Sequence, residues 1–437
     1  MRKKKSVPSG TLTRLSTISK AAIKCAGKQV THMASSALAS AQKKQQKAKK
    51  HHQKLGQDMF NVVSTLKGAA LKAAQLITTE FDLFPAEFQA ELEKSCYLAP
   101  PLNRAIVYKV IQNQFKQSPD TVFKEFEPQA FAAASIGQVH KGKTHQEKTV
   151  AIKIQYPGID KTIEQDMRLL RLVLKGLPLR ELKNKSTMIN IYLTEIEQRF
   201  IEETDYIKEK KHLDWFYTHN PFKQLMIPQS IDNCCSKHVL TMTLLPGQHV
   251  TQWLKQNPTQ QQRDQAAQLL WDSFIYFFIN HNILHADPNS GNYLFTDTGQ
   301  VGLIDFGCVK QCNKDYPLQI KRMMTAYIQN DIATIMTIYN TWQILPKHLV
   351  NDNKTVVNYI KHFQQWITKP FKYDIFDFNE HPTYMAERFN SQFKQAVDII
   401  HTPNHHFVMF DRTYIGLLNI FNKMKARVRF SFDIDLL

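Results

Sequence analysis

Acidic residues are missing from the first part of this 437-residue chain. The first of them is Asp58, and fourteen lysines and arginines precede it, so most of the formal net charge of +18 lies in residues 1–56. The same segment has no Phe, Tyr or Trp on which bases could stack, so no nucleic-acid partner is expected. The sequence therefore predicts a basic N-terminal tail on a chain of otherwise nearly balanced charge.

Long apolar runs and closely spaced cysteines are also missing. The most apolar window, residues 269–284, is interrupted by Asp272, Asn280, His281 and Asn282. Since a transmembrane helix needs about 18–20 apolar residues, none is predicted. The six cysteines are too few and too scattered for a disulfide framework, and they lack the paired spacing of a zinc site. We expect free thiols in a reducing compartment.

The basic tail contains the spacing of an amphipathic helix. Leu15, Ile18, Ala22 and Cys25 would share one face and lysines another, which is typical of a helix lying on anionic lipid. A solvated tail and a cleaved mitochondrial transit peptide are the alternatives, although Lys outnumbers Arg. The expected location is cytoplasmic and peripheral on a membrane, or mitochondrial in a eukaryote.

Residues 285–307 have the order of a phosphoryl-transfer site. They read HADPNSGNYLFTDTGQVGLIDFG, with predicted strands at 293–295 and 301–304 joined by a turn. An HxDxxxxN motif followed by DFG is how kinase-type enzymes place a nucleophile and metal ions around ATP phosphates. We therefore predict Asp287 as the catalytic residue, Asn292 and Asp305 as metal ligands, and ATP with Mg²⁺ (or Mn²⁺) as cofactors.

Residues 121–160 predict the strands of a small lobe. One strand is expected at 137–141 and another at 149–155, and the second contains VAIK, whose Lys153 would reach the nucleotide phosphates. Where a kinase has a glycine-rich loop, this chain has four other residues, Ala132, Ala133, Ala134 and Ser135. Their N–H groups could cradle phosphates, but alanine avoids positive φ, so we expect a stiffer loop.

Residues 187–213 predict one long helix with an apolar stripe. The stripe comprises Ile189, Leu193, Ile196, Phe200 and Ile207. Glu203 falls on the same stripe, and a buried carboxylate requires a cation or a metal as its partner. Glu209, four residues after Asp205, could pair with Lys153. A solvated acidic face is the alternative for these carboxylates.

The remaining segments complete a predicted α+β, bilobal, protein-kinase-like fold. We expect a helical extension at 57–120, a β-rich N-lobe at 121–245 ending in a strand at 240–245, and a helical C-lobe at 246–437. Further helices are expected at 251–284, 318–330, 332–342, 356–366, 384–400 and 414–427. No A-P-E follows the DFG, which argues against a phosphorylation-switched protein kinase.

Four motifs in order resemble the UbiB/AarF family of atypical kinase-like proteins. They are LKGAALKAAQ, AAASIGQVH with VAIK, EETDYIKE, and HADPNSGN with DFG, and they span about residues 58 to 310. The resemblance implies a kinase-like fold, ATP and magnesium binding, and ATPase activity. It also implies a role in coenzyme Q (ubiquinone) synthesis or related isoprenoid-lipid work at membranes. Anionic lipid, isoprenoid quinone precursors and quinone-biosynthesis enzymes are then the expected partners.

The resemblance also assigns roles to individual residues. Lys72 and Gln75 would be the ends of the family's KxGQ motif, on a helix lying across the active site, with Ala74 in place of the usual glycine. Glu203 and Asp205 would form the ExD pair, and Lys72 would be the ion partner of Glu203. Lys153 with Glu209 would bind the nucleotide, beside the set of Asp287, Asn292 and Asp305.

Two other functions remain open from the sequence. A small-molecule or protein kinase would transfer the ATP γ-phosphate, and HADPNSGN also resembles the motif of aminoglycoside-type phosphotransferases, which lack KxGQ and ExD. A nucleotide-sensing scaffold would bind ATP with negligible turnover.

Overall fold

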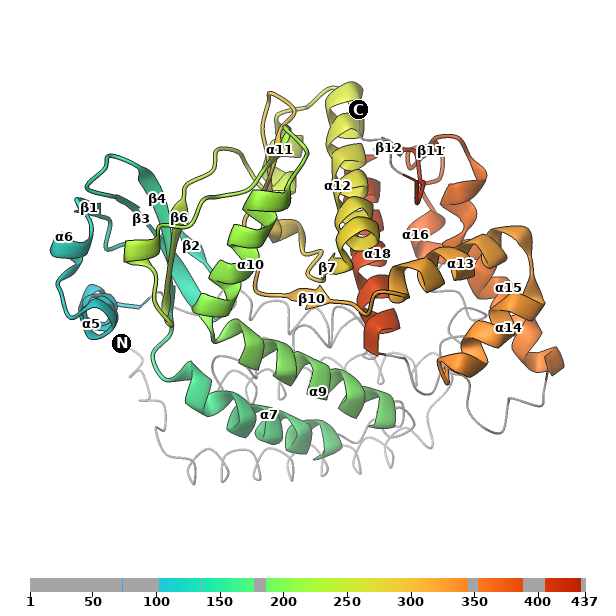
Figure 1. Ribbon diagram of the computed structural model, residues 1–437, viewed down its shortest axis with the longest axis horizontal. Helices are drawn as coiled ribbons and strands as arrows, with labels where there is room; N and C mark the ends of the chain where they lie inside the picture. Colours follow the sequence, from blue (N-terminus) through green and yellow to red (C-terminus); the bar gives the residue numbers. More distant parts are fainter. Residues whose placement is uncertain are drawn as a thin grey trace, which may run out of the picture. The chain divides into compact units, whose positions relative to one another are not determined.

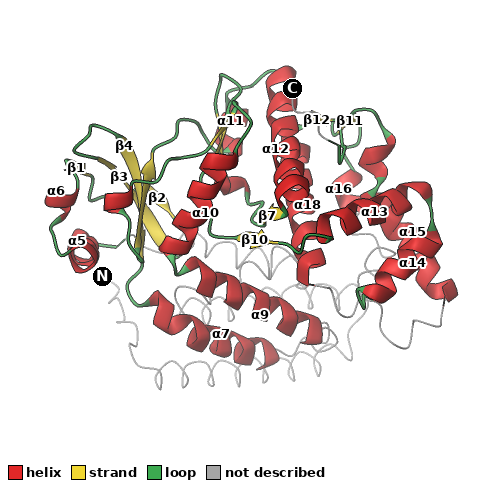
Figure 2. Ribbon diagram, viewed as in Figure 1, coloured by secondary structure: helices red, strands yellow, loops and turns green. Residues whose placement is uncertain are grey.

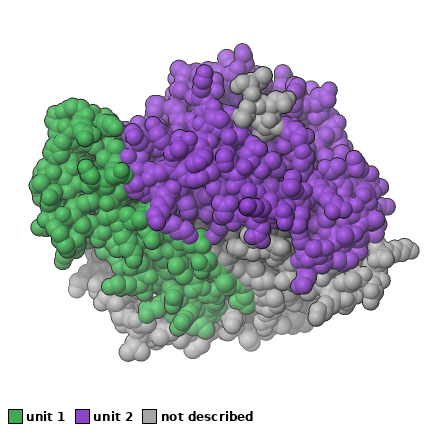
Figure 3. Space-filling view, in the orientation of Figure 1, with its two compact units in different colours: residues 1–207, 231–241 green, residues 208–230, 242–437 purple. Residues whose placement is uncertain are grey.

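The computed structural model describes residues 102–134, 136–176, 186–344, 353–387 and 405–433, together with Ala73. Two compact units divide the chain, one of residues 1–207 and 231–241 and the other of 208–230 and 242–437 (Figure 3). The basic tail, most of the predicted extension, and Lys72, Gln75 and Ser135 lie outside the described residues. The domain boundaries drawn from the sequence stay predictions.

The first unit contains an antiparallel sheet. Its strands are β1 (Glu125–Phe126), β2 (Ala132–Ala133), β3 (Gly137–Lys143), β4 (Thr149–Gln155) and β6 (Val239–Thr243). The order is β1-β3-β4-β6, with β2 paired to β3 (Figure 1). β3 and β4 pair over their whole length, from Gly137 opposite Gln155 to Lys143 opposite Thr149. The strands expected at 137–141 and 149–155 are confirmed.

One face of β4 forms the core of this unit. Val150, Ile152 and Ile154 alternate along the strand and pack with Val107 and Ile111 of α5 (Arg104–Phe115). All five side chains are fully buried, and burial of each contributes about 1.5–3 kcal/mol to folding. Because neighbouring residues of a strand point to opposite sides, the other face of β4 presents Ala151, Lys153 and Gln155. The core thereby fixes the side from which Lys153 projects.

Three helices follow the β3–β4 hairpin. They are α7 (Ile159–Gly176), α9 (Ser186–Glu203) and α10 (Tyr206–His219). α7 and α9 lie side by side, joined by an ion pair of 2.7 Å between Arg171 and Glu197 (Figure 1). The single helix predicted for 187–213 is therefore wrong, because the chain breaks between Glu203 and Tyr206.

Short polar side chains cause this break. Asp205 accepts a hydrogen bond from the Ile207 N–H at 3.0 Å, and the Thr204 hydroxyl donates to the Ile201 carbonyl at 2.6 Å. Gln155 of β4 donates to the Thr204 carbonyl at 3.0 Å, which ties the break to the sheet. Glu203 is buried as the stripe predicted, but Ile207, beyond the break, is 37% exposed.

The second unit is built around α12 (Gln260–His281). A separate short helix, α11 (Val250–Lys255), precedes it, so the single helix predicted for 251–284 is also wrong. Asn257 has a φ of 54° and is followed by Pro258, and both features end a helix. The new helix begins with a capping box made by Thr259 and Gln262.

The helix α18 (His405–Met424) packs beside α12 through aromatic rings (Figure 1). The ring centroids of Phe274 and Phe410 lie 5.6 Å apart, and those of Trp271 and Tyr414 lie 5.9 Å apart. α18 begins well before the predicted start at residue 414, and it ends at Met424 rather than 427. Apolar residues on these two helices thus supply much of the unit's core.

The other elements of the second unit are short strands and further helices (Figure 2). The strands are β5 (Leu225–Met226), β7 (Ile283–His285), β8 (Tyr293–Phe295), β9 (Val301–Leu303), β10 (Val309–Gln311), β11 (Phe376–Asp377) and β12 (Arg427–Val428). The helices are α13 (Tyr316–Gln329), α14 (Ile332–Thr341), α15 (Asn353–Ile367) and α16 (Tyr384–Glu387). α16 covers the first four residues of the helix predicted at 384–400, and the rest of that helix lies outside the described part. None of the helices in that part has the length and apolar character to cross a bilayer.

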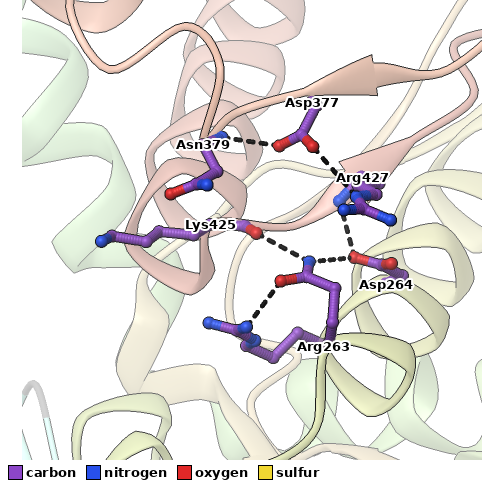
Figure 4. A network of polar contacts seen from close by, with 7 residues as sticks. Arg263, Asp264, Asp377, Asn379, Lys425 and Arg427 are labelled. Atoms are coloured by element: carbon purple, nitrogen blue, oxygen red, sulfur yellow. Dashed lines mark hydrogen bonds and ion pairs between the residues drawn. The ribbon is translucent and has the colours of Figure 1, made fainter.

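A polar network ties the chain after α18 to the first turns of α12 (Figure 4). Oδ1 of Asp264 accepts hydrogen bonds of 2.7 Å from the Arg427 N–H and from the Gln260 amide. The Gln260 amide also donates to the Lys425 carbonyl at 2.9 Å, and the Arg427 guanidinium donates to Asp377 at 2.9 Å. One carboxylate therefore joins α12 to β12, and Arg427 joins β12 to β11.

Replacing Asp264 by Ala should lower the free energy of unfolding by about 1–2 kcal/mol, because the Arg427 N–H loses its side-chain acceptor and the Gln260 amide loses one of its two acceptors. Denaturant unfolding followed by tryptophan fluorescence measures this change, and amide hydrogen exchange at Arg427 should accelerate. Asp315→Ala is the matched control, since Asp315 is exposed and its side chain makes no capping bond. Equal stabilities for the two variants would show that the network does not hold β12.

Candidate nucleotide and metal site

The β8–β9 hairpin brings together the two predicted metal ligands of the second unit. Asn292 directly precedes β8, and Asp305 follows the end of β9 by two residues. Tyr293 pairs with Leu303, and the Ile304 N–H donates to the Asn292 carbonyl at 3.1 Å. Asn292 and Asp305 therefore stand at the same end of one hairpin, as the sequence predicted.

Asn292 also contacts the predicted catalytic residue. Its side-chain nitrogen donates to Oδ2 of Asp287 at 2.8 Å and to the Asp287 carbonyl at 3.1 Å. Because the nitrogen is used in this way, the amide oxygen of Asn292 is the atom suited to bind a cation. The contact links the predicted catalytic residue to one of the predicted metal ligands.

Asp305 is held by groups on both sides of the motif. Its Oδ1 accepts the Gly307 N–H at 2.9 Å, and its carbonyl accepts a hydrogen bond of 2.7 Å from Nε2 of His285. The segment after Asp305 pairs with the segment before Asp287, since β10 lies antiparallel to β7. The Ala286 N–H also donates to the Cys308 carbonyl at 2.8 Å. His285 is thus a positioning group that connects the two halves of the motif.

α10 supports the DFG backbone from another direction. Glu209 and His212 lie three residues apart on this helix and both reach Phe306. The Phe306 N–H donates to Oε1 of Glu209 at 3.4 Å, and Nδ1 of His212 donates to the Phe306 carbonyl at 3.0 Å. Sequence reasoning named Glu209 but missed His212, although its i+3 spacing from Glu209 was visible.

Lys153 belongs to the first unit and is almost fully buried, with 5% of its surface exposed. Its ammonium lies 5.2 Å from the ring centroid of Tyr206, a cation–π contact that makes burial of the charge less unfavourable. The predicted partner Glu209 belongs to the second unit. The Lys153–Glu209 pair therefore stays a prediction.

The alanine segment is partly a strand. Ala132 and Ala133 form β2 opposite Val139 and Gln138, and the Ala134 N–H donates to the Gly137 carbonyl at 3.0 Å. None of these three alanines has a positive φ. A backbone paired in this way fits the expectation of a stiffer loop than glycine would make, while its contact with phosphate stays a prediction.

The ExD residues flank the helix break in the first unit. Glu203 is the last residue of α9 and is buried, and Asp205 begins α10 by accepting the Ile207 N–H. Lys72 and Gln75 lie outside the described residues, so the Lys72–Glu203 ion pair stays a prediction. Ala73 between them is fully buried.

The structure adds one residue pair that the sequence did not indicate. Arg412 of α18 lies 3.8 Å from Asp287, measured from Nη2 to Oδ1. One turn later, Gly416 lies against Pro288, where an added Cβ would be only 2.2 Å from the Pro288 Cγ. No motif spacing points to Arg412, which lay before the helix predicted at 414–427.

Burial raises the pKa of two groups, Tyr293 at the start of β8 and Cys312 directly after β10. It raises the pKa of Tyr293 well above its ordinary value, and the neighbouring Asp287 charge adds to this effect. Burial also raises the pKa of the Cys312 thiol to about 11. Among the described cysteines, Cys234, Cys235, Cys308 and Cys312 are free thiols, as expected. With its raised pKa, Cys312 stays protonated and is a poor nucleophile at neutral pH.

Replacing Gly416 by Ala should destabilise the protein by about 1–3 kcal/mol, although Ala for Gly within a helix ordinarily stabilises by about 1 kcal/mol. The clash dominates because the ring of Pro288 is rigid and buried. Thermal and denaturant unfolding measure the change. Asn419→Ala, at an exposed position of the same helix, is the control; a gain in stability for Gly416→Ala would contradict the close approach.

The donor set fits a magnesium ion. Mg²⁺ prefers oxygen ligands, and a protein usually binds it through one or two carboxylates. Asp305 supplies a carboxylate, and Asn292 supplies an amide oxygen because its nitrogen is turned to Asp287. Soft ligands are not part of this set, which disfavours zinc.

Comparison with known proteins shows which family this chain resembles. The model of the ABC1 atypical kinase-like domain matches residues 97–339. The chain is 26% identical over 293 residues to the probable serine/threonine-protein kinase abkA of Dictyostelium discoideum, covering 64% of this chain and 51% of that protein. It is 27% identical over 269 residues to ACTIVITY OF BC1 COMPLEX KINASE 7, chloroplastic, of Arabidopsis thaliana, covering 61% and 38%.

A solved structure shares the fold. Rv3197 of Mycobacterium tuberculosis, solved in complex with erythromycin, superposes with a TM-score of 0.60 at 21% identity, covering 85% of this chain and 92% of that one. The curated relatives named above are longer, and the chain spans about half of their length or less. The predicted α+β kinase-like fold is confirmed, and the family model matches more than half of the chain. The chain belongs to the ABC1 (UbiB/AarF) family of atypical kinase-like proteins.

Proposed function

We propose that this protein is a kinase-like ATPase that binds ATP with Mg²⁺ (or Mn²⁺) through Lys153, Asp287, Asn292 and Asp305. The observation that carries the proposal is the convergence of Asp287, Asn292 and Asp305 at one end of the β8–β9 hairpin. Three oxygen-bearing side chains held by hydrogen bonds are the arrangement that phosphoryl transfer requires.

The residues divide the chemistry between them. The buried ammonium of Lys153 would bind phosphate oxygens, and Asn292 and Asp305 would hold the metal. Magnesium, when bound, neutralises phosphate charge. Asp287 would orient the attacking water and accept its proton as the oxygen bonds to the γ-phosphorus and the bond to the leaving ADP oxygen breaks. Asn292 and His285 keep Asp287 and Asp305 in place.

We further propose that the activity serves ubiquinone or related lipid metabolism at a membrane surface. Two features support this: the resemblance to the UbiB/AarF family and the acid-free, strongly basic residues 1–56. About 1 kcal/mol of attraction per Lys or Arg near anionic lipid would make such a tail a sufficient peripheral anchor.

A second candidate is transfer of the γ-phosphate to a small molecule or a protein. Similarity to the Dictyostelium relative, which is named a probable serine/threonine-protein kinase, favours it. γ-Phosphate found on an acceptor, rather than as free phosphate, would distinguish this reaction from ATP hydrolysis.

Replacing Asp305 by Asn should lower the ATP hydrolysis rate by about a hundredfold or more, because one anionic metal ligand becomes neutral. The Mg²⁺ dependence of nucleotide binding, measured by calorimetry, should weaken as well. Asp315→Asn, at an exposed position away from the hairpin, should match the unsubstituted protein. Unchanged hydrolysis and binding in Asp305→Asn would show that the metal site lies elsewhere.

Vesicles containing anionic lipid should stimulate hydrolysis by the full chain, and deletion of residues 1–55 should abolish that stimulation without lowering the basal rate. The physical reason is that the deletion removes fourteen positive charges of a formal net charge of +18. Neutral vesicles are the control, and raised salt should reduce the effect. Equal stimulation of both proteins would exclude the tail as the membrane contact.

A further inference from the structure

The aspartate of the HADPN segment faces a cation that belongs to none of the family motifs. Nη2 of Arg412 lies 3.8 Å from Oδ1 of Asp287, and their side chains are only 17% and 10% exposed. A carboxylate buried to that degree is unfavourable unless an opposite charge compensates it. Asn292 donates to the other carboxylate oxygen, so Arg412 and Asn292 contact different oxygens of Asp287.

The position of this guanidinium is set by a well-packed helix. Arg412 and Gly416 are separated by one turn of α18 and lie on the same face. Gly416 is in close contact with Pro288, the residue that follows Asp287, and Tyr414 packs on Trp271 of α12. The backbone that carries Arg412 is therefore held against the loop that carries Asp287.

We propose that Arg412 is a phosphate-binding residue, which holds Asp287 in the free protein and donates hydrogen bonds to the terminal phosphate of bound ATP. The proposal rests on the ATP-binding function proposed above. Asp287 would orient an oxygen that stands in line with the γ-phosphorus, so a group 3.8 Å from its carboxylate lies within reach of the γ-phosphate oxygens. Arginine suits this position because its planar fork of five N–H donors matches phosphate and can serve a carboxylate at the same time.

The alternative is that Arg412 only neutralises Asp287. The two roles differ in what they do to nucleotide selectivity. A neutralising residue supports the site equally for ATP and ADP, whereas a ligand of the γ-phosphate strengthens the binding of ATP alone. The ratio of the two dissociation constants therefore separates the roles.

The test uses the full chain with Asp287→Asn, which retains the shape of the side chain and slows hydrolysis during the measurement. Calorimetry gives the dissociation constants for Mg-ATP and Mg-ADP. In this background Arg412→Gln should weaken Mg-ATP binding by about tenfold and leave Mg-ADP binding within about twofold, the size of one lost charge-assisted contact. Arg322→Gln, which removes an exposed arginine of α13, should change neither constant.

Arg412→Lys provides a second variant if the glutamine variant folds poorly, and it should retain part of the preference for ATP because one charge remains. An unchanged ratio in both variants, or an equal loss of ATP and ADP binding, would overturn the phosphate-binding role. If the unsubstituted chain binds neither nucleotide, the proposed function itself is wrong and this inference fails with it.

Discussion

The hydrogen bond from the Ile304 N–H to the Asn292 carbonyl sets the register on which the candidate site depends. In a hairpin, a slip of one residue turns every side chain to the opposite face. Such a slip would separate Asp305 from Asn292, and Asn292 in turn orients Asp287. Three side chains of the proposed site thus depend on one pair of short strands.

The parts of this site that could be predicted from the sequence are local. The β8–β9 hairpin follows from two short apolar runs around an Asp-Thr-Gly turn, and the bounds of β4 follow from alternation. The motif then supplied Asp287, Asn292 and Asp305 by their order alone. Such features depend on residues that lie close together in the sequence, and they can therefore be predicted from one sequence.

The parts that could not be predicted depend on tertiary contacts or on competing local bonds. Apolar periodicity continues through 187–213, yet Thr204 and Asp205 satisfy backbone groups and end the helix with the help of Gln155, far away in the sequence. Pro258 indicates a break before α12, but the helical pattern of residues 251–284 favoured a single helix. Nothing near Arg412 indicates that it meets Asp287, because the contact arises only when α18 packs beside α12.

The pairing of α18 with the Asp287 loop also has a consequence for the order of events during synthesis. Asp287 leaves the ribosome more than a hundred residues before Arg412 and Gly416. Domains of a growing chain fold as their segments emerge, and contacts of long sequence separation form late. A nascent chain can complete its β8–β9 hairpin early, but the aspartate loop gains its last support only after α18 has emerged as well.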